Sequence, residues 1–282
     1  MTQLIRAKKS LGQNFLIDRL VARRIVDAVS PLATDLIIEI GPGTGALTRM
    51  LVERSGYVEA VEIDTRLAEE LQRSMKAENL SIVTADALSL DWIQLITNAK
   101  EKLRAMKSLD PNTLRVRIVA NLPYYISTPI IEKLLSLGDR LLEMTLMLQK
   151  EVADRITTGP GNKEYGYLSV MVQYYCIASK LFEVSPESFA PAPKVESAVI
   201  RLAVRERPAV EVADEARFFA LVRAAFAQRR KTILNNLRAA SSTLKFTRPL
   251  ESALEAAFVA PNRRAETLSL EEFAALSREL VR

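Results

Sequence analysis

The chain has 282 residues, of which 49% are apolar and 26% are charged, a balance typical of a globular protein with room for one large and one smaller domain. Histidine is absent, which excludes His-ligated metal sites and the Ser-His and Cys-His nucleophile pairs. With a single cysteine, Cys176, no intrachain disulfide is possible, and its apolar neighbours predict a buried structural thiol.

The net positive charge lies at the two ends of the chain. Residues 1–24 hold six Lys or Arg and one Asp, and residues 208–282 hold twelve Lys or Arg and nine acids. Basic ends favour contact with a polyanion, and a solvated basic surface is the alternative. The first residues lack an apolar signal segment and no run of 18 apolar residues occurs, so we expect a cytoplasmic protein without membrane contact.

Short apolar, β-branched runs alternate with helical patterns through the first 205 residues. This alternation is the signature of βαβ units and of a mostly parallel sheet. Apolar spacing predicts helices over Ala46–Arg54, Thr65–Lys76, Val152–Ile156 and Tyr167–Tyr175. Strands are predicted over Leu36–Ile40, Tyr57–Ile63, Ser81–Ala85, Val116–Ala120, Met144–Leu148, Ile177–Val184 and Ser197–Val204.

The segment Ser185–Glu196 between the last two strands contains three prolines and is too short for a crossover helix, so these strands are expected to pair antiparallel. The predicted fold class is α/β, a Rossmann-like seven-stranded sheet with a reversed final strand. After residue 207 only helical patterns occur, and they predict helices over Asp214–Ala227, Arg230–Ala240, Leu250–Phe258 and Ser269–Leu280. We therefore predict a catalytic domain over 1–207 and a small all-helical domain over 208–282.

A glycine-rich turn follows the first strand. Leu36–Ile40 runs directly into Gly41-Pro42-Gly43-Thr44-Gly45, where the backbone must pass close to a ligand. The G-x-G-x-G spacing differs from the G-x-G-x-x-G that binds a pyrophosphate, so a nicotinamide cofactor is disfavoured. The turn suits a compact zwitterionic group such as the methionine part of S-adenosylmethionine, and a tight turn without a ligand is the alternative.

Acidic residues end the next two strands. Glu62 is placed to accept both ribose hydroxyls of an adenosine, whereas Asp64 is better suited to cap the following helix. Asp86 is placed to accept from the adenine amine, and the backbone N–H of Ala87 to meet the ring. Because the carboxyl ends of parallel strands share one crevice, we predict a single cofactor site lined by Gly41, Gly43, Gly45, Glu62, Asp86 and Ala87.

The sequence Asn121-Leu122-Pro123-Tyr124 ends the fourth strand. Methylation of the N6 amine of adenine requires hydrogen-bond acceptors for the two N–H groups, and the side-chain carbonyl of Asn121 and the main-chain carbonyl of Leu122 are placed to supply them. Pro123 fixes the turn, and Tyr124 offers a ring on which an extruded base stacks. An ordinary strand-end turn with a surface aromatic is the alternative.

These residues together resemble the ribosomal RNA adenine dimethylases, and the resemblance covers essentially the whole chain. Lys9–Leu16 resembles the N-terminal motif of that family, which closes over the cofactor, and this implies cofactor contacts at Gln13, Asn14 and Leu16. Asn121 also occupies a cofactor position of the family. Ser188–Val199 resembles the segment whose aromatic residue, here Phe189, faces the target base opposite the tyrosine.

The tail resembles the branch of the family that modifies the small ribosomal subunit, through Ala225–Thr232 and Arg264–Ser269. This implies N6-dimethylation of two adjacent adenosines in a hairpin loop near the 3′ end of 16S rRNA during small-subunit biogenesis, with S-adenosylmethionine as cofactor and no metal. It also implies that Arg223, Arg229, Arg230 and Lys231 lie against rRNA phosphate, a solvated helix face being the alternative. A monomer is expected.

One departure from the family is a longer segment between Trp92 and Val116, with the charged helical stretch Asn98–Lys107 inserted before the fourth strand. It is either a surface elaboration or an additional rRNA contact. Other functions also remain open: a 23S rRNA adenine dimethylase that confers antibiotic resistance, a mainly non-catalytic ribosome-assembly factor, and a DNA adenine methylase, which the helical tail disfavours.

Overall fold

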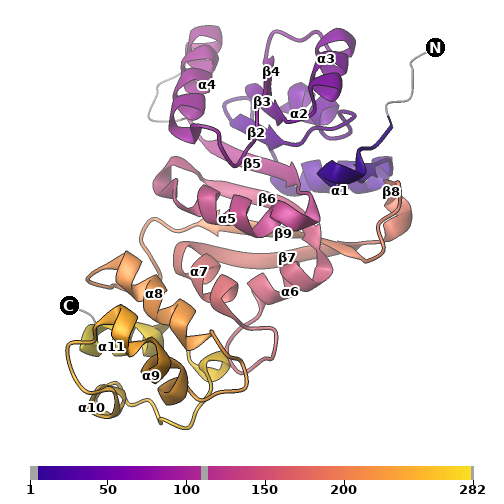
Figure 1. The fold of residues 1–282 in the computed structure, drawn as a ribbon. Coiled ribbons are helices and arrows are strands. Elements are labelled where there is room, and N and C mark those ends of the chain that lie inside the picture. Colours follow the sequence, from indigo (N-terminus) through magenta and orange to yellow (C-terminus); the bar gives the residue numbers. More distant parts are fainter. Residues whose placement is uncertain (1–5, 109–113, 281–282) are drawn as a thin grey trace. The chain divides into compact units, whose positions relative to one another are not determined.

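The computed structural model describes residues 6–108 and 114–280 (Figure 1). It contains two compact units. The first comprises the residues up to 153 together with 179–204, and the second comprises 154–178 together with the residues from 205 onward. The second unit thus includes a segment from the middle of the chain as well as the C-terminal helices. The assignment of separate functional domains on either side of residue 207 stays a prediction.

Seven strands form one sheet in the order β4-β3-β2-β5-β6-β9-β7. From β4 to β6 neighbouring strands are parallel, and β9 runs antiparallel to β6. The predicted seven-stranded α/β sheet with a reversed final strand is confirmed, and β9 lies beside β7 as expected. The bounds are β2 Leu36–Ile40, β3 Tyr57–Glu62, β4 Leu80–Thr84, β5 Val116–Asn121, β6 Glu143–Gln149, β7 Cys176–Val184 and β9 Ser197–Val204.

A second, two-stranded sheet joins the N-terminal segment to the loop before β9. Strand β1 (Phe15–Leu16) pairs antiparallel with β8 (Phe189–Ala190), and Leu16 lies opposite Phe189. The sequence analysis did not predict this sheet. It holds residues of the N-terminal motif against a segment more than 170 positions away in the chain.

The helices of the first unit follow the strands in the alternating order expected of βαβ units. They are α1 Arg19–Val29, α2 Thr48–Arg54, α3 Thr65–Ser74, α4 Trp92–Lys107 and α5 Ser127–Leu135. Helix α6 (Lys150–Thr157) follows β6 and is divided between the two units after residue 153. Short 3₁₀ helices occur at Lys9–Leu11, Tyr124–Ile126, Gly138–Arg140 and Pro186–Ser188. Helices α1 and α2 pack on the sheet face that carries Ile37, Val58 and Val119.

The charged stretch Asn98–Lys107 is the C-terminal part of α4 and is continuous with the residues that precede it. Ala99 and Leu103 on this stretch are fully buried, and Lys102 forms an ion pair with Glu59 of β3. One side of the stretch therefore belongs to the core of the first unit. An insertion that lay only on the surface would not contribute buried side chains to that core.

The second unit is helical apart from the first residues of β7. It contains α7 Tyr167–Tyr175, α8 Glu215–Ala225, α9 Ile233–Leu244, α10 Leu250–Ala256 and α11 Leu270–Leu280, with a 3₁₀ turn at Ala265–Thr267. Its core includes the fully buried rings of Tyr165, Tyr174, Phe218 and Phe273. The predicted C-terminal helices are confirmed. Within the described parts of the chain, no helix combines the length and apolarity that crossing a membrane requires.

The start of α9 was predicted three residues too early. Thr232 is the N-cap of this helix, because its side chain accepts a hydrogen bond from the backbone N–H of Asn235. Arg229, Arg230 and Lys231 lie in the turn before the helix, where the N–H of Lys231 donates to the carbonyl of Gln228. The basic run is therefore an exposed turn, not a helix face.

Candidate active site

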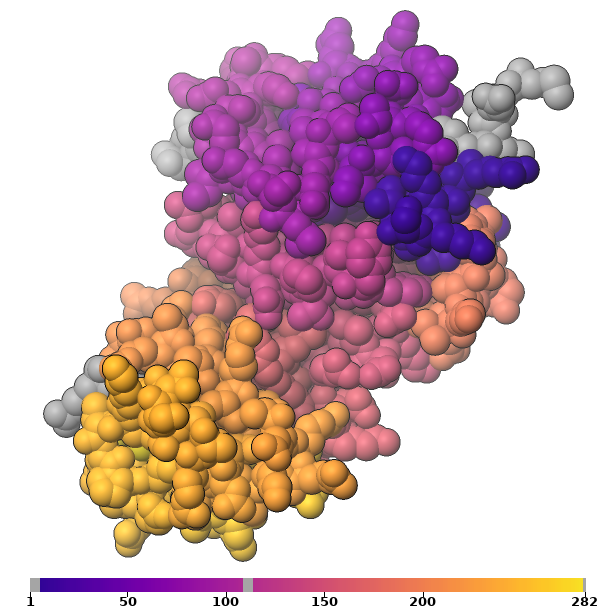
Figure 2. All heavy atoms as spheres, viewed as in Figure 1, coloured from indigo at the N-terminus to yellow at the C-terminus, as the bar shows by residue number. Residues whose placement is uncertain are grey.

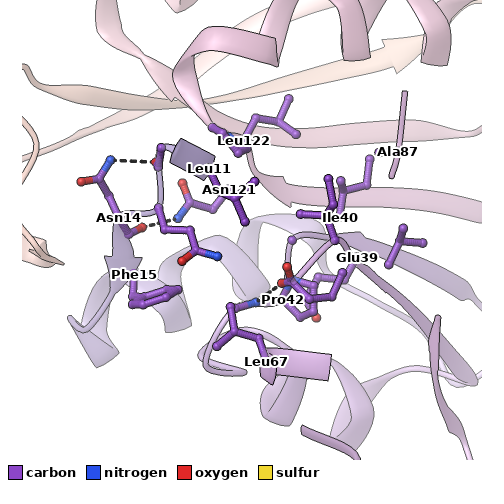
Figure 3. A pocket seen from close by; sticks show the side chains of 18 of the residues that line it. Leu11, Asn14, Phe15, Glu39, Ile40, Pro42, Leu67, Ala87, Asn121 and Leu122 are labelled. Atoms are coloured by element: carbon purple, nitrogen blue, oxygen red, sulfur yellow. Dashed lines mark hydrogen bonds between the residues drawn. The ribbon is translucent and has the colours of Figure 1, made fainter. Parts of the chain in front are cut away.

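A pocket lies at the carboxyl ends of β2, β3, β4 and β5, and the N-terminal segment forms another of its walls (Figure 3). This is where open α/β sheets bind ligands. Most of the predicted site residues line it together, namely Gln13, Asn14, Leu16, Gly41, Gly43, Glu62, Asp86, Ala87, Asn121, Leu122, Pro123 and Tyr124. Gly45 and Phe189 do not line it.

The glycines of the turn after β2 have different surroundings. Gly41 has a φ of 68°, and a Cβ atom there would meet only the carbonyl oxygen of Asn121, at 3.8 Å, so the absence of a side chain leaves space in the pocket. Gly45 has a φ of 80°, but a Cβ there would lie 2.7 Å from Cδ2 of Leu71 on α3. Gly41 therefore helps to shape the pocket, whereas Gly45 allows α3 to pack closely.

Glu62 is the last residue of β3 and joins this strand to the glycine turn. Its Oε2 accepts from the backbone N–H of Gly43 at 3.1 Å, and its Oε1 accepts from that of Asp64 at 2.9 Å. Burial raises the pKa of Glu62, and the hydrogen bonds from Asp64 and Gly43 oppose that shift. Because a carboxylate oxygen has two lone pairs, each oxygen retains capacity for a ligand hydroxyl.

The Asp86–Leu88 segment after β4 is held by side chains from two helices. The indole N–H of Trp92 donates to the carbonyl of Ala87 at 3.0 Å, and the ammonium of Lys133 on α5 donates to the carbonyl of Leu88 at 2.5 Å. Oδ1 of Asp86 accepts from the N–H of Leu88 at 2.9 Å. These contacts fix the loop that carries the predicted adenine-binding groups.

Glu39 is a pocket residue that the sequence analysis missed (Figure 3). It lies inside the apolar strand β2, is only 2% exposed, and its Oε2 has no hydrogen-bond partner among the described residues. Burial raises its pKa to about 8, and the neighbouring carboxylate of Glu62 makes a smaller upward contribution. The sequence did contain a signal for this residue, because it places a carboxylate within a strand predicted to be buried, directly before the glycine turn. A buried carboxylate needs a hydrogen-bonding or charged partner, which a ligand can supply.

The N-terminal segment is attached to the pocket through Asp64. The buried carboxylate of Asp64 accepts from Lys8 at 3.1 Å, from Gln13 at 3.3 Å and from Arg66 at 2.7 Å. These bonds, that of Arg66 foremost, hold the pKa of Asp64 far below its usual range. Asp64 also caps α3 as expected, by accepting from the N–H of Arg66. In the space-filling view the indigo N-terminal segment lies against the purple surface of the following residues (Figure 2).

Asn121 ends β5 and is oriented by the N-terminal segment (Figure 3). Its amide nitrogen donates to the main-chain carbonyl of Asn14 at 3.2 Å. The side-chain carbonyl oxygen at the other end of the amide is therefore left as the acceptor. The Asn14 side chain in turn donates to the carbonyl of Gly12 at 3.2 Å, which fixes this part of the segment.

The turn after Asn121 is held by backbone hydrogen bonds. The N–H of Leu122 donates to the carbonyl of Met147 on β6 at 3.2 Å, and the carbonyl of Pro123 accepts from the N–H of Ile126 at 3.2 Å. No main-chain hydrogen bond among the described residues outside the helices and strands ends on the carbonyl of Leu122. Of these two neighbouring carbonyls, that of Leu122 is thus the one available to a ligand.

The two predicted aromatic partners of the base have different environments. Tyr124 lines the pocket and is half-buried. Phe189 is only 4% exposed and packs in the core with Leu16 and Val21, because its position in β8 turns the ring away from solvent. A place for Phe189 beside the target base stays a prediction.

The four predicted RNA-binding residues in the second unit also differ in their contacts. The Arg223 guanidinium lies 4.6 Å from the centre of the Tyr167 ring and donates to the Tyr167 hydroxyl at 2.9 Å. Arg229, Arg230 and Lys231 are exposed in the turn between α8 and α9. All four residues are exposed, but Arg223 also contacts Tyr167 within the unit, whereas the other three lie in a turn.

Comparison with known proteins identifies the family. A family model described as ribosomal RNA adenine dimethylase matches residues 5–281. The chain belongs to the ribosomal RNA adenine dimethylase family. It is therefore a methyltransferase, and the resemblance seen in the motifs is confirmed.

Several bacterial relatives within the family are closely similar over nearly the full length. The ribosomal RNA small subunit methyltransferase A of Anoxybacillus flavithermus is 48% identical, with 97% of this chain and 90% of that protein aligned. The protein of the same name from Clostridium acetobutylicum is 44% identical, over 98% of this chain and 95% of that one. Methyltransferases of the small subunit are thus among its similar relatives.

Two solved structures of rRNA-modifying or adenosine-modifying enzymes share the fold. A dimethyladenosine transferase from Plasmodium falciparum is 26% identical, with a TM-score of 0.74 over 94% of this chain and 96% of that chain. The 23S rRNA methyltransferase ErmE is 27% identical, with a TM-score of 0.68 over 95% of this chain and all of that chain. A dimethyladenosine transferase and a 23S rRNA methyltransferase are therefore both structurally similar to it.

Proposed function

We propose that the protein dimethylates N6 of two adjacent adenosines in a hairpin loop near the 3′ end of 16S rRNA, with S-adenosylmethionine as methyl donor. The observation that carries this proposal is the hydrogen bond from the Asn121 amide nitrogen to the carbonyl of Asn14, which leaves the Asn121 carbonyl oxygen as an acceptor beside the pocket. An acceptor held in this way suits an exocyclic amine, which has two N–H groups to donate.

The pocket residues fit S-adenosylmethionine. The space beside Gly41 admits a ligand where any side chain would intrude, and the unpartnered Oε2 of Glu39 suits the ammonium of the methionine part. Glu62 retains acceptor capacity for the ribose hydroxyls, and Asp86 with the N–H of Ala87 suits the adenine edge. When bound, this cofactor supplies an electrophilic methyl group without a metal.

The catalytic loop acts on the amine through hydrogen bonding and orientation. The Asn121 carbonyl oxygen and the Leu122 carbonyl accept the two N–H groups, which turns the nitrogen lone pair out of conjugation with the ring and stabilises positive charge as it develops. Pro123 keeps this turn rigid, and Tyr124 stacks on the base. No base has to deprotonate the amine beforehand, and the methylated nitrogen releases one proton to solvent after each transfer, so the chemistry is compatible with a protein that lacks histidine.

Support for the small subunit as substrate comes from the tail motifs and from the relatives that bear its name. Ribosomal RNA carries a dense negative charge, which the exposed turn at Arg229–Lys231 matches. Because ribosomes are assembled in the cytoplasm of bacteria, we place the protein there and propose that it acts during small-subunit biogenesis, as a monomer. No metal enters the proposal.

The test is incubation of small subunits from an undermethylated strain with labelled S-adenosylmethionine, followed by mass spectrometry of the rRNA. We expect dimethyladenosine at two adjacent positions of 16S rRNA. Large subunits and duplex DNA serve as comparison substrates. Label in 23S rRNA instead of 16S rRNA would support the resistance branch that the ErmE structure represents, and label in DNA alone would overturn RNA as the substrate.

The variant Asn121→Ala tests the mechanism. Removal of a group that stabilises developing charge in the transition state costs ~10²-fold or more in kcat. Asn98→Ala changes the same residue type at an exposed position of α4 and is the matched control. Unchanged methylation by Asn121→Ala would contradict the role of this side chain and would assign catalysis to other groups.

A further inference from the structure

A side-chain hydrogen bond connects the catalytic loop to β9. The hydroxyls of Tyr124 and Ser197 are 2.8 Å apart, although the residues are 73 positions apart in the chain. Ser197 is the first residue of β9 and is 1% exposed. None of the motif considerations above gives Ser197 a role.

Ser197 is a rigid partner for this bond. It lies opposite Gln149 in the antiparallel ladder between β6 and β9, and the carbonyl of the preceding residue, Glu196, accepts from the N–H of Lys150 at 3.0 Å. The backbone at Ser197 is thus fixed by the end of β6 and the start of α6. A hydroxyl on such a backbone has few positions available to it.

The rest of Tyr124 is restrained except for rotation of its side chain. The carbonyl of Tyr124 accepts from the Ser127 hydroxyl at 3.2 Å, and the N–H of Ile126 donates to Pro123, so the backbone of the loop is fixed. The ring lines the pocket and is half-buried. Burial raises the pKa of Tyr124, so the phenol stays protonated and available for the bond at neutral pH.

We infer that Ser197 is a positioning residue, which holds the Tyr124 ring in the orientation that stacks on the target adenine. This inference rests on the proposed function and adds a specific requirement to it. A ring that rotates freely loses conformational entropy each time a base binds, and this loss makes stacking less favourable. A ring that the Ser197 hydroxyl already holds in place does not lose this entropy on binding.

The experiment is a double-mutant cycle with Ser197→Ala, Tyr124→Phe and the combined variant, assayed on undermethylated small subunits. Tyr124→Phe keeps the stacking surface and removes only the hydroxyl. Because a neutral hydrogen bond contributes ~0.5–1.5 kcal/mol, we expect each single variant to lower kcat/KM for the RNA substrate by ~2- to 10-fold. The combined variant should be no worse than either single variant, and the Kd of S-adenosylmethionine should be unchanged in all three.

Ser55→Ala is the matched control, since it removes another buried serine hydroxyl, which donates to the carbonyl of Leu51 away from the pocket. It should leave kcat/KM unchanged. Melting temperatures of all variants show whether the fold is intact. Multiplicative losses in the combined variant, or a loss in Ser55→Ala equal to that in Ser197→Ala, would overturn the inference while the proposed function stands. If the wild-type protein methylates no 16S rRNA adenine, the proposed function and this inference fail together.

Discussion

Among single residues, Glu39 has a carboxyl group whose protonation changes with folding. It lies on β2, an interior strand of the sheet, and burial raises its pKa from 4.5 to about 8. Between these two values the folded protein keeps a proton that the unfolded chain has lost. The free energy of unfolding therefore decreases as the pH rises through this range, by up to ~1.4 kcal/mol per pH unit for this one group.

Glu39→Gln should remove this contribution. We expect the variant to unfold at higher urea concentration than the wild type at pH 8 and above, and to differ little from it at pH 4.5, where both side chains are neutral when folded. The measurement is urea unfolding of the cofactor-free protein at a series of pH values. The exposed Glu101 of α4 supplies the control Glu101→Gln. Parallel stability curves for the wild type and Glu39→Gln would show that Glu39 is ionised in the folded protein.

The same substitution should act in the opposite direction on cofactor binding. A cationic group beside Glu39 favours the charged carboxylate and lowers its pKa, so binding near neutral pH should release a proton. Glu39→Gln should weaken S-adenosylmethionine binding and abolish this proton release. Calorimetry in buffers of different ionisation enthalpy measures both quantities. Equal proton release in the two proteins would assign it to another group.

At the scale of elements, the N-terminal segment forms one wall of the pocket and is held by Asp64 at the end of β3. The contacts from Lys8 and Gln13 span more than 50 positions of sequence, and β1 adds a backbone connection to β8. Because the main-chain carbonyl of Asn14 orients the Asn121 side chain, we expect that loosening this segment affects both cofactor binding and catalysis.

Asp64→Asn should loosen the N-terminal segment without unfolding the protein. Asparagine retains the capping of α3 but loses the ion pairs with Lys8 and Arg66. We expect faster trypsin cleavage after Lys8 or Lys9 and a ~10-fold increase in the Kd of S-adenosylmethionine. Asp27→Asn, which breaks an exposed ion pair with Arg54, is the control. Equal cleavage rates in the two variants would contradict a role of Asp64 in holding the segment.

Helix α4 provides a test of whether the stretch Asn98–Lys107 is structural. Leu103 is fully buried, whereas Met106 is 40% exposed on the same helix. Leu103→Ala should lower the free energy of unfolding by ~2–5 kcal/mol, and Met106→Ala by much less, because only the first leaves a cavity. Denaturant titration measures both. Similar small effects would mean that the stretch does not contribute to the core.

The sequence predicted those elements whose pattern is local. Buried parallel strands such as β2 and β5 are continuous apolar runs, and the glycine turn follows directly from one of them. Helix α1 was missed although Val21, Ile25 and Val29 recur every four residues behind the cap Asp18, a signal that was present but not used. The sheet of β1 and β8 was not predicted, because each strand has two residues and is too short to show an alternating pattern in the sequence.

Within the site, the sequence grouped residues that end consecutive strands but did not reveal how side chains are paired. Glu62 and Asn121 were predicted because strand ends converge on one edge of the sheet. The direction of the Glu39 side chain and the distant partners Ser197 and Asp64 depend on strand register and on helix packing, which only the folded chain defines. Gly45 is the opposite case. It fits the sequence motif but packs against α3 and does not line the pocket.

At the scale of the whole molecule, the net charge of +5 is concentrated at the ends of the chain. In the second unit the turn Arg229-Arg230-Lys231 and the helix residue Arg223 are all exposed, but Arg223 also stacks on the Tyr167 ring. A contact between a basic side chain and a phosphate releases counterions. The slope of the binding constant against salt concentration therefore reports the number of such contacts. Salt dependence therefore separates side chains that touch RNA from side chains that only stabilise the unit.

Replacing Arg229, Arg230 and Lys231 together by alanine should weaken binding to small subunits and make it less sensitive to salt. Each lost phosphate contact lowers the slope of log K against log salt by ~0.7–0.9, so three contacts account for roughly 2 to 3. Arg223→Ala should instead lower the melting temperature through the lost Tyr167 contact, with a smaller change in slope. Binding measured over a series of salt concentrations gives the slopes. An unchanged slope in the triple variant would show that the turn does not contact phosphate, and a large change in Arg223→Ala would place that guanidinium at the RNA as well.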